Sequence, residues 1–225
     1  MAKLIIVPTP IGNLSDITFR AVEVLKNCNF ILAEDTRQTL KLLNHLNIKK
    51  SVYAYHKFNE HQRLNSIIEQ IEGAESSALV SDAGTPGISD PGFLIVRECI
   101  SHGIEVECLP GPVAFIPALV CSGLPCDRFI FEGFLPQKKG RKSRIEKLAN
   151  EDRTVVLYES PFRLVKTLTE FSEAAEPERI ASVSREISKI YEEHKRGSLK
   201  ELAEYFSKKT PKGEIVVVIS GKNKD

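Results

Sequence analysis

The sequence predicts an α/β protein of two domains, each with a mostly parallel or mixed sheet flanked by helices. Short apolar, β-rich runs alternate with helical patterns along the chain, which is typical of βαβ units. The length of 225 residues is large for one small domain and suits two compact domains of similar size. The pattern changes near residue 120, so we expect domains at 1–120 and 121–225.

Elements of the first half follow from apolar runs and their periods. Strands are expected at 3–7, 30–33, 51–55, 77–81 and 105–109. Helices are expected where apolar residues recur with the period of an α-helix. The two clearest stripes are Ala21, Val22, Leu25 and Cys28, and Leu64, Ile67, Ile68 and Ile71. Asp90 followed by Pro91 predicts the start of a further helix that runs through Cys99.

Turn residues divide the second half in the same way. Gly111-Pro112 and Leu124-Pro125 bound a short apolar helix at 113–122. Strands are expected at 129–133, 154–158, 180–184 and 214–219. Ser160-Pro161 repeats the signal of a helix start, and Ser198 with Glu201 forms a capping box before another helix.

Charge and composition exclude several classes of protein. The chain has 31 Lys and Arg against 30 Asp and Glu, a net charge of +1, which excludes a protein that is basic all over. No apolar run approaches the roughly 18–20 residues of a membrane span. The first apolar run is too short for a signal peptide, so we interpret it as a buried strand and expect no membrane partner.

Cysteine and histidine patterns give no sign of a metal. The five cysteines form no Cys-x-x-Cys pair, which favours neither a disulfide framework nor a zinc site. The histidines form no His-x-x-x-His motif, so no metal is expected. Free cysteines in apolar stretches suit a reducing, cytoplasmic setting.

Three polar loops follow predicted strands, where ligands bind in open α/β sheets. They lie at 8–16, 33–37 and 81–92. The third contains Gly84, Gly87 and Gly92, whose spacing is neither the dinucleotide fingerprint nor a Walker A motif, so binding of NAD or ATP phosphates is disfavoured. A turn-rich connection that only caps helices remains the alternative from turn chemistry alone.

Eight motifs in order carry a resemblance to a known family. They are PTPIGNLSDI at 8–17, AEDTR at 33–37, SDAGTPGISDPG at 81–92, PGPVA at 110–114, SGLP at 122–125, GFLP at 133–136, YESP at 158–161 and Arg185-Glu186. Together they resemble the ribosomal RNA small subunit methyltransferase I family, within the tetrapyrrole methylase superfamily, from residue 4 to residue 219.

The resemblance implies a fold and an activity. It implies a tetrapyrrole methylase-like fold with S-adenosylmethionine in the cleft between two domains, a homodimer, and 2′-O-ribose methylation of a cytidine in the decoding region of 16S ribosomal RNA. The substrate would be the RNA or the 30S subunit. Relatives often carry a C-terminal extension beyond the position of Ser220, so contacts made by that extension are expected to be absent here.

Small residues and polar groups of the motifs are the candidates for cofactor binding. They are Pro8, Gly12, Ser81, Asp82, Ala83, Gly84, Ile88, Val113, Ala114, Tyr158, Arg185 and Gly213. Core packing is the alternative for Val113, Ala114 and Tyr158, and a purely conformational role is the alternative for Gly84.

Methyl transfer requires positioning of the two reactants, helped by a base or by a cation that stabilises the developing alkoxide. We expect Arg37 to hold RNA phosphate and Glu186 or Lys189 to act on the ribose hydroxyl, so these three are the catalytic candidates. Glu186 and Lys189 are three residues apart and share a face if the stretch is helical. An ordinary ion pair is the alternative.

A basic segment at 138–147 contains six basic residues and one acidic residue, a local charge of +5. Such a cluster suits contact with a phosphate backbone, although charge runs are also common on solvated helices. With Arg37, the predicted RNA-binding residues are Lys138, Lys139, Arg141, Lys142 and Arg144.

Two other functions stay open from the sequence. One is methylation of a tetrapyrrole or corrin ring, as elsewhere in the superfamily; the basic segment and the AEDTR and YESP motifs favour RNA over it. The other is a binding module that contacts ribosomes without catalysis. Intact motifs in both halves of the chain favour an enzyme over that module.

Overall fold

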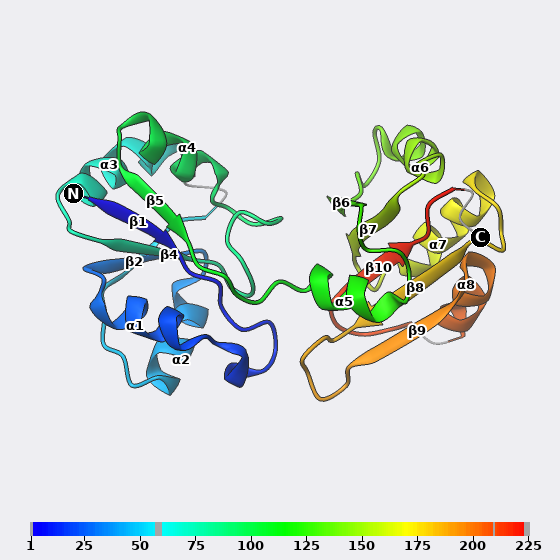
Figure 1. Cartoon of the computed structure of the whole chain (residues 1–225), viewed down its shortest axis with the longest axis horizontal. Helices are drawn as coiled ribbons and strands as arrows, with labels where there is room; N and C mark the ends of the chain where they lie inside the picture. The colour runs from blue at the N-terminus through cyan, green and yellow to red at the C-terminus, as the bar shows by residue number, and fades with distance from the viewer. Residues whose placement is uncertain (1, 57–59, 209, 223–225) are drawn as a thin grey trace. The chain divides into compact units, whose positions relative to one another are not determined.

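The chain folds into two compact units, Met1–Val113 and Ala114–Asp225 (Figure 1). The structure is a computed structural model and describes residues 2–56, 60–208 and 210–222. The division falls just before helix α5 (Phe115–Ser122), whereas a boundary at residue 120 would cut this helix. Both units are α/β, as the sequence predicts.

A fully parallel sheet forms the centre of the first unit, in the order β3-β2-β4-β1-β5. Its strands are β1 (Lys3–Ile6), β2 (Phe30–Ala33), β3 (Val52–Ala54), β4 (Ser77–Val80) and β5 (Glu105–Cys108). The chain runs outward from β1 to β3 and returns to β4, beside β1, before it reaches β5. All the strands therefore end at one edge of the sheet, where the loops that follow them meet.

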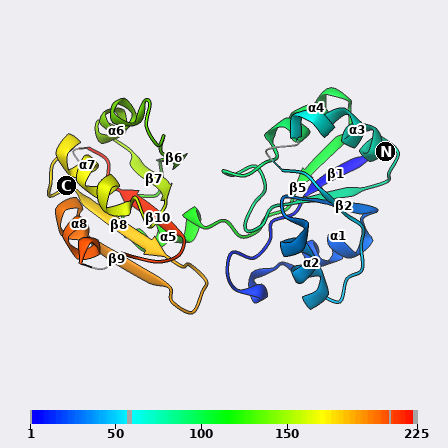
Figure 2. The ribbon, with the colours of Figure 1, turned by 180° about the vertical axis from the view of Figure 1, so that it is seen from behind.

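Helices cover both faces of this sheet. Helices α3 (Glu60–Glu72) and α4 (Phe93–Ser101) lie on one face, and α1 (Phe19–Asn27) and α2 (Thr36–His45) lie on the other, as Figures 1 and 2 show. Successive side chains of β1 alternate between the two cores, because strand residues point to opposite faces. Leu4 and Ile6 join one cluster, and Ile5 and Val7 join the other.

The second unit has a mixed sheet in the order β6-β7-β10-β8-β9. Its strands are β6 (Phe129–Phe134), β7 (Thr154–Glu159), β8 (Ile180–Arg185), β9 (Glu193–Ser198) and β10 (Ile215–Ile219). Only β6 and β7 pair in parallel; the other pairs are antiparallel. Helices α6 (Arg141–Ala149), α7 (Leu164–Ala174) and α8 (Leu199–Ser207) share one core with the sheet, and α5 packs against its other face.

The first residues of three helices can be compared with the capping signals in the sequence. The capping box of Ser198 and Glu201 at α8 is confirmed. The other two predicted starts are wrong: α4 begins at Phe93 after Gly92, and α7 begins at Leu164 after Arg163, and neither cap residue makes a side-chain hydrogen bond. Residues 161–163 form a turn before α7, whereas Gly92 alone separates Pro91 from α4.

Candidate functional site

Two loops at the edge of the first sheet are joined by a short β-bridge. Thr9, which follows β1, pairs with Gly84, which follows β4, through two backbone hydrogen bonds of 2.9 Å each. The Thr9 hydroxyl also donates to the carbonyl of Ser81 at 3.2 Å. These contacts fix the first and third polar loops of the sequence against each other.

The loop that follows β5 packs onto the same structure. A Cβ atom at Gly111 would lie 2.5 Å from the Cβ of Pro8, so only glycine allows this approach. Gly84 has a φ of 84°, which favours glycine, and its α-carbon faces Ile11 and the carbonyl of Pro112. The hydroxyl of Thr85 donates to that carbonyl at 2.9 Å. Three of the sequence motifs therefore form one interlocked surface.

The AEDTR motif reaches this surface through Asp35. The Asp35 amide donates to the carboxylate of Asp82 at 3.0 Å, and the Asp35 side chain caps α2 by accepting from the Arg37 amide. Arg37 folds back on Asp35, with Nε 3.0 Å from Oδ1 and NH2 2.6 Å from Oδ2, and its side chain is 85% exposed. The guanidinium of Arg37 therefore lies on the surface beside the loops.

Three carboxyl groups with different pKa values lie close together here. Burial raises the pKa of Glu34, and the charge of Asp82 adds to that rise. Desolvation by the surrounding loops likewise raises the pKa of Asp82. In contrast, hydrogen bonds from Arg37 lower the pKa of Asp35 to about 2. The edge of the sheet thus carries negative charge that the fold only partly compensates, which suits a cationic group of a ligand.

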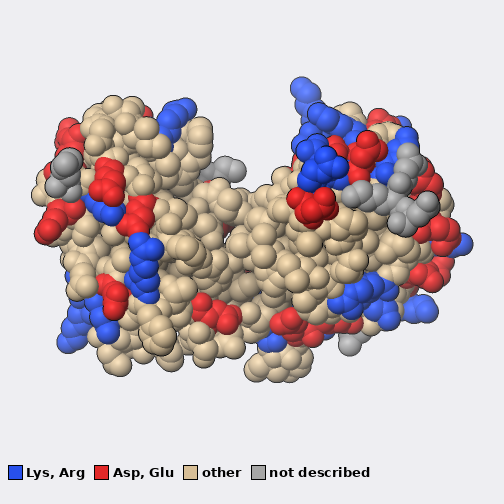
Figure 3. Space-filling model, in the orientation of Figure 1, with Lys and Arg blue, Asp and Glu red and all other residues tan. Residues whose placement is uncertain are grey.

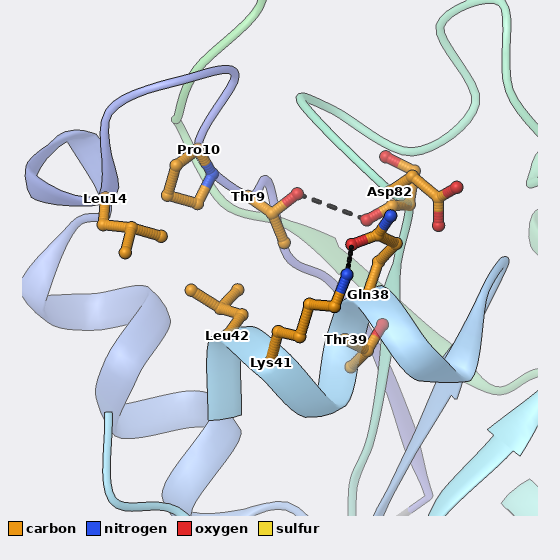
Figure 4. Close-up of a pocket in the computed structure, with 9 residues that line it drawn as sticks. Thr9, Pro10, Leu14, Gln38, Thr39, Lys41, Leu42 and Asp82 are labelled. Atoms are coloured by element: carbon orange, nitrogen blue, oxygen red, sulfur yellow. Dashed lines mark hydrogen bonds between the residues drawn. The ribbon is translucent and has the colours of Figure 1, made fainter. Parts of the chain in front are cut away.

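A cavity of about 270 Å³ opens between the first loop, α2 and the end of β4 (Figure 4). It is lined by Thr9, Pro10, Leu14, Gln38, Thr39, Lys41, Leu42, Ser81 and Asp82. Ser81 and Asp82 are predicted cofactor residues. Pro8, Gly12, Ala83, Gly84, Ile88 and Val113 belong to the same loops outside this lining.

The residues that α2 contributes to the cavity were not predicted. The amine of Lys41 lies 3.2 Å from Oε1 of Gln38, and Thr39 is buried. A signal for them exists in the sequence, because Asp35 is an N-cap residue directly after a buried strand. Side chains of the first turns of such a helix lie beside the end of that strand.

In the second unit, Glu186 and Lys189 form an ion pair on a turn rather than on a helix. Lys189 Nζ lies 2.8 Å from Oε1 of Glu186 and 3.1 Å from Oε2 of Glu214. The Glu186 carboxylate also accepts from the backbone amide of Glu214 at 3.1 Å and lies directly against Gly213. The predicted pair is therefore brought together with Gly213, in a compact polar cluster.

The pKa values of this pair favour the charged forms. The hydrogen bond from Lys189 lowers the pKa of Glu186. Burial alone would lower the pKa of Lys189, but hydrogen bonds to Glu186 and Glu214 outweigh it, so the pKa is raised. Lys189 is thus a stable cation, and neither group is poised to take a proton near neutral pH.

A hydrogen-bonded chain that was not predicted lies next to this cluster. Ser184 Oγ is 2.7 Å from Nδ1 of His194, and Nε2 of His194 is 2.7 Å from Oε1 of Glu192. The neighbouring Arg185, a predicted cofactor residue, pairs with Glu193 at 2.5 Å. These pairs connect β8 with β9. The strand pattern of β9 was missed because its residues, EHKRGS, are mostly polar.

The basic segment divides into an inner and an outer half. Arg141 is only 5% exposed and donates to Glu170, to Thr167 and to the carbonyl of Pro136, at 2.8, 2.7 and 3.3 Å. Arg144 donates to Glu132 at 2.6 Å. Their positions argue against the predicted RNA contacts of these two arginines, because both guanidinium groups are engaged within the unit.

Lys138, Lys139 and Lys142 form the outer half, and all three are exposed. No ion pair of these lysines occurs within the described part of the chain. Figure 3 shows Lys and Arg side chains gathered over α6 and the loop before it. Two cofactor candidates of the second unit remain. Tyr158 is the last residue but one of β7, where its ring contacts Phe131 and Phe134, and Ala114 is the N-cap residue of α5.

The described part of the chain has neither a membrane-spanning helix nor a cluster of metal-binding side chains. Across ranges 2–56, 60–208 and 210–222, no helix is long and apolar enough to cross a membrane. In the same ranges, no group of three or more His, Cys, Asp or Glu side chains is placed to hold a metal ion.

Comparisons with solved structures agree with the fold. Uroporphyrin III C-methyltransferase from Thermus thermophilus superposes with a TM-score of 0.68 and 18% identity, over 96% of each chain. A cobalt precorrin-4 methyltransferase superposes with a TM-score of 0.69 and 17% identity, over 97% of this chain and 95% of the other. At such identities the likeness concerns the fold alone.

Comparisons of sequence are closer. The family model of tetrapyrrole (corrin/porphyrin) methylases matches residues 3–203. Ribosomal RNA small subunit methyltransferase I of Thermotoga maritima is 47% identical over 222 residues, which are 99% of this chain and 100% of that protein. The protein of the same name from Synechocystis is 48% identical over 98% of this chain and 80% of its own length. The chain therefore belongs to the ribosomal RNA small subunit methyltransferase I family of the tetrapyrrole methylases.

Proposed function

We propose that this protein transfers a methyl group from S-adenosylmethionine to the 2′-oxygen of a cytidine ribose in the decoding region of 16S ribosomal RNA. The observation that carries the proposal is the identity of 47% over the whole length of a ribosomal RNA small subunit methyltransferase I. The interlocked loops at the edge of the first sheet support it, because they contain the motifs on which the resemblance rests.

The loops of the first unit fit the chemistry of S-adenosylmethionine. When bound, this cofactor supplies a methyl group on a cationic sulfonium, and it also has an α-ammonium group. Glu34 and Asp82 provide negative charge, while Thr9 and Ser81 provide hydroxyl groups beside them. Gly84 and Gly111 have no side chain, so the loops can pack closely and their main-chain groups stay accessible. A ligand held by main-chain groups requires such access.

In the second unit, Tyr158, Arg185 and Gly213 are the candidates for contact with the cofactor, and Lys189 would act on the acceptor. A ribose hydroxyl becomes an alkoxide as it attacks, so a fixed cation lowers the barrier. The raised pKa of Lys189 suits that role better than the role of a base. Glu186 positions Lys189 through their ion pair of 2.8 Å.

RNA would be held by exposed cations. Arg37 is the candidate in the first unit, and Lys138, Lys139 and Lys142 are the candidates in the second. Phosphate contacts of this kind provide affinity without sequence information. Selection of one nucleotide must therefore come from groups that touch the bases. A homodimer and a cytoplasmic location are further parts of the proposal and rest on the family resemblance and on the free cysteines.

A single labelling experiment tests the function. The full chain is incubated with a labelled methyl donor and, in parallel, with 30S subunits, naked 16S RNA and a porphyrin precursor, all from cells that lack this gene. We expect label in one of the RNA samples, in a nuclease-resistant, alkali-stable dinucleotide that contains a 2′-O-methylcytidine. Label in the porphyrin, or in no sample although the cofactor binds, would refute the proposal.

A further inference from the structure

Phe134 is a large aromatic side chain left on the surface at the end of β6. Phe134 is 54% exposed, although Gly133 and Leu135 on either side are buried. It belongs to the GFLP motif, to which the proposed function gives no role. A single exposed apolar residue is common on protein surfaces, so a binding role for Phe134 must follow from how its ring is held and from what lies beside it.

A β-bulge determines where this ring points. In the register of β6 and β7, Phe131 lies opposite Val156 and Gly133 lies opposite Leu157, so Glu132 is an extra residue. In a regular strand without a bulge, Phe131 and Phe134 are three residues apart and would point to opposite faces, because side chains alternate along a strand. With it, Phe134 lies opposite Tyr158 and shares the face of Phe131. Gly133 accommodates the bulge with a φ of 69°.

Because of the bulge, the ring of Phe134 lies at the outer end of a row of aromatic rings. Its ring centroid lies 5.6 Å from that of Tyr158, which lies 5.1 Å from that of Phe131. Phe131 in turn stacks on Phe115 at 4.3 Å. The inner rings therefore support Phe134 from one side, and its exposed side is open for a further planar group.

An ion pair stabilises this arrangement. Glu132, the extra residue, has a side chain that is only 9% exposed, and it accepts from Nε of Arg144 at 2.6 Å. The second nitrogen of the guanidinium pairs with the other carboxylate oxygen. Two parallel bonds of this kind fix geometry as well as charge. Arg144 is thus a positioning residue for the bulge.

Positive charge follows directly after the ring. The chain passes from Phe134 into a short loop with Lys138 and Lys139, and Lys142 lies in the first turn of α6. These three exposed lysines have no acidic partner among the residues that the structure describes. An exposed ring next to unpaired cations is the combination that binds single-stranded nucleic acids, where a base stacks and the phosphates are neutralised.

We propose that Phe134 stacks on an unpaired base of the RNA, while Lys138, Lys139 and Lys142 hold the phosphates beside that base. The inference rests on the proposed function, and it adds a contact to a base where the lysines alone give only sequence-independent affinity. A stacked base must leave its own helix, so the partner is a single-stranded or unwound segment rather than a regular duplex.

The test compares variants of the full chain for binding to a single-stranded oligoribonucleotide that contains 2-aminopurine. Phe134→Leu keeps an apolar side chain but removes the ring, and Phe134→Trp keeps a ring. Phe19→Leu is the matched control, because Phe19 is 93% exposed in the other unit. We expect Phe134→Leu to weaken binding on the order of 10-fold and to abolish quenching of the 2-aminopurine, whereas the other two variants bind as the wild type does.

The salt dependence of RNA binding distinguishes the contribution of the Phe134 ring from that of the three lysines. For single strands, each phosphate contact contributes about 0.7 to the slope of log affinity against log salt. The triple variant K138A/K139A/K142A should therefore lower this slope by about 2, whereas Phe134→Leu should leave it unchanged. A slope that is unchanged in the triple variant would overturn the lysine part of the proposal.

Two other binding partners of the Phe134 ring would give different results. If Phe134→Leu binds the RNA as tightly as the wild type, the stacking proposal is overturned. In that case a loss of S-adenosylmethionine affinity would assign the ring to the cofactor, and a change of oligomeric mass would assign it to a second copy of the chain. A wild-type chain that binds RNA through Phe134 and methylates none would overturn the proposed function alone.

Discussion

The carboxylate of Glu186 lies against the α-carbon of Gly213 so closely that no Cβ atom fits between them. Both residues have a positive φ, of 52° for Glu186 and 90° for Gly213. A non-glycine residue in this region stores strain, which a surrounding structure must offset. Here the Glu186 carboxylate accepts from Lys189 and from the amide of Glu214.

This packing predicts coupling between the two positions. Gly213→Ala should lower the free energy of unfolding by about 1–3 kcal/mol, because the methyl group meets the carboxylate and the backbone is strained. In a Glu186→Ala background the clash is gone, so the same substitution should cost less. Denaturant unfolding of the four proteins in a double-mutant cycle measures the difference. Equal costs in both backgrounds would contradict the packing.

Lys189 and Glu186 should differ in their effects on catalysis. Lys189→Met removes the cation that we assign to the developing alkoxide, and we expect the single-turnover rate to fall about 100-fold or more. Glu186→Gln keeps the hydrogen bond geometry and should reduce the rate less. Rates are measured with saturating cofactor, after the cofactor affinity and the fold of each variant have been checked. Near wild-type rates for both variants would refute the assignment.

The carboxyl group of Asp82 should reduce stability at neutral pH. Its pKa is raised in the folded state, so the ionised form is disfavoured by folding. Stability linked to this group is therefore fully present below its unfolded pKa and is lost as the pH rises through the folded pKa. Asp82→Asn does not titrate, yet its side-chain oxygen still accepts from the Asp35 amide.

We accordingly expect Asp82→Asn to be more stable than the wild type at pH 7 and equally stable near pH 3. Unfolding by urea at a series of pH values provides the comparison. Binding of S-adenosylmethionine should weaken in the same variant, since the negative charge is lost. A stability difference that grows toward acid pH would have the opposite sign from the one predicted.

Arg141 and Lys142, two neighbouring basic residues of α6, should contribute differently to the stability of the fold. Arg141→Met should lower the free energy of unfolding by about 2–4 kcal/mol, because buried hydrogen bonds to Glu170 and Thr167 are lost. Arg141 also lies 3.9 Å from the buried carboxylate of Glu159. That carboxylate keeps its ion pair with Arg163 at 2.9 Å in the variant, so the cost stays below that of an uncompensated buried charge. Lys142→Met is the matched control, and its effect should stay within about 0.5 kcal/mol. Thermal or denaturant unfolding distinguishes the two.

Much of the first unit could be predicted from the sequence, because its chemistry follows its topology. Buried parallel strands read as apolar runs, and the loops after them must meet at one edge. That reasoning located the polar loops around Thr9, Asp35 and Gly84. It could not show that Lys41 faces the same cavity, since the direction of a surface side chain depends on how α2 packs.

The second unit was harder to predict. Strand β9 lacks the apolar alternation that marks a strand, because polar pairs such as Ser184 with His194 replace it on one face. Arg141 looked like part of a solvated charge run, and its burial depends on Glu170, which lies 29 residues away in the chain. The face of the sheet to which the Phe134 side chain points depends on one extra residue in β6. The alternation of apolar and polar residues in the sequence does not reveal such a bulge.

The bridge between Thr9 and Gly84 has a consequence for synthesis of the protein. It joins segments that are far apart in the chain, and the contact of Gly111 with Pro8 adds a third segment from the end of the unit. A nascent chain can therefore assemble the edge that carries these three loops only after residue 113 has left the ribosome. Protection of these loops from proteolysis, measured on stalled chains of increasing length, should begin abruptly rather than gradually.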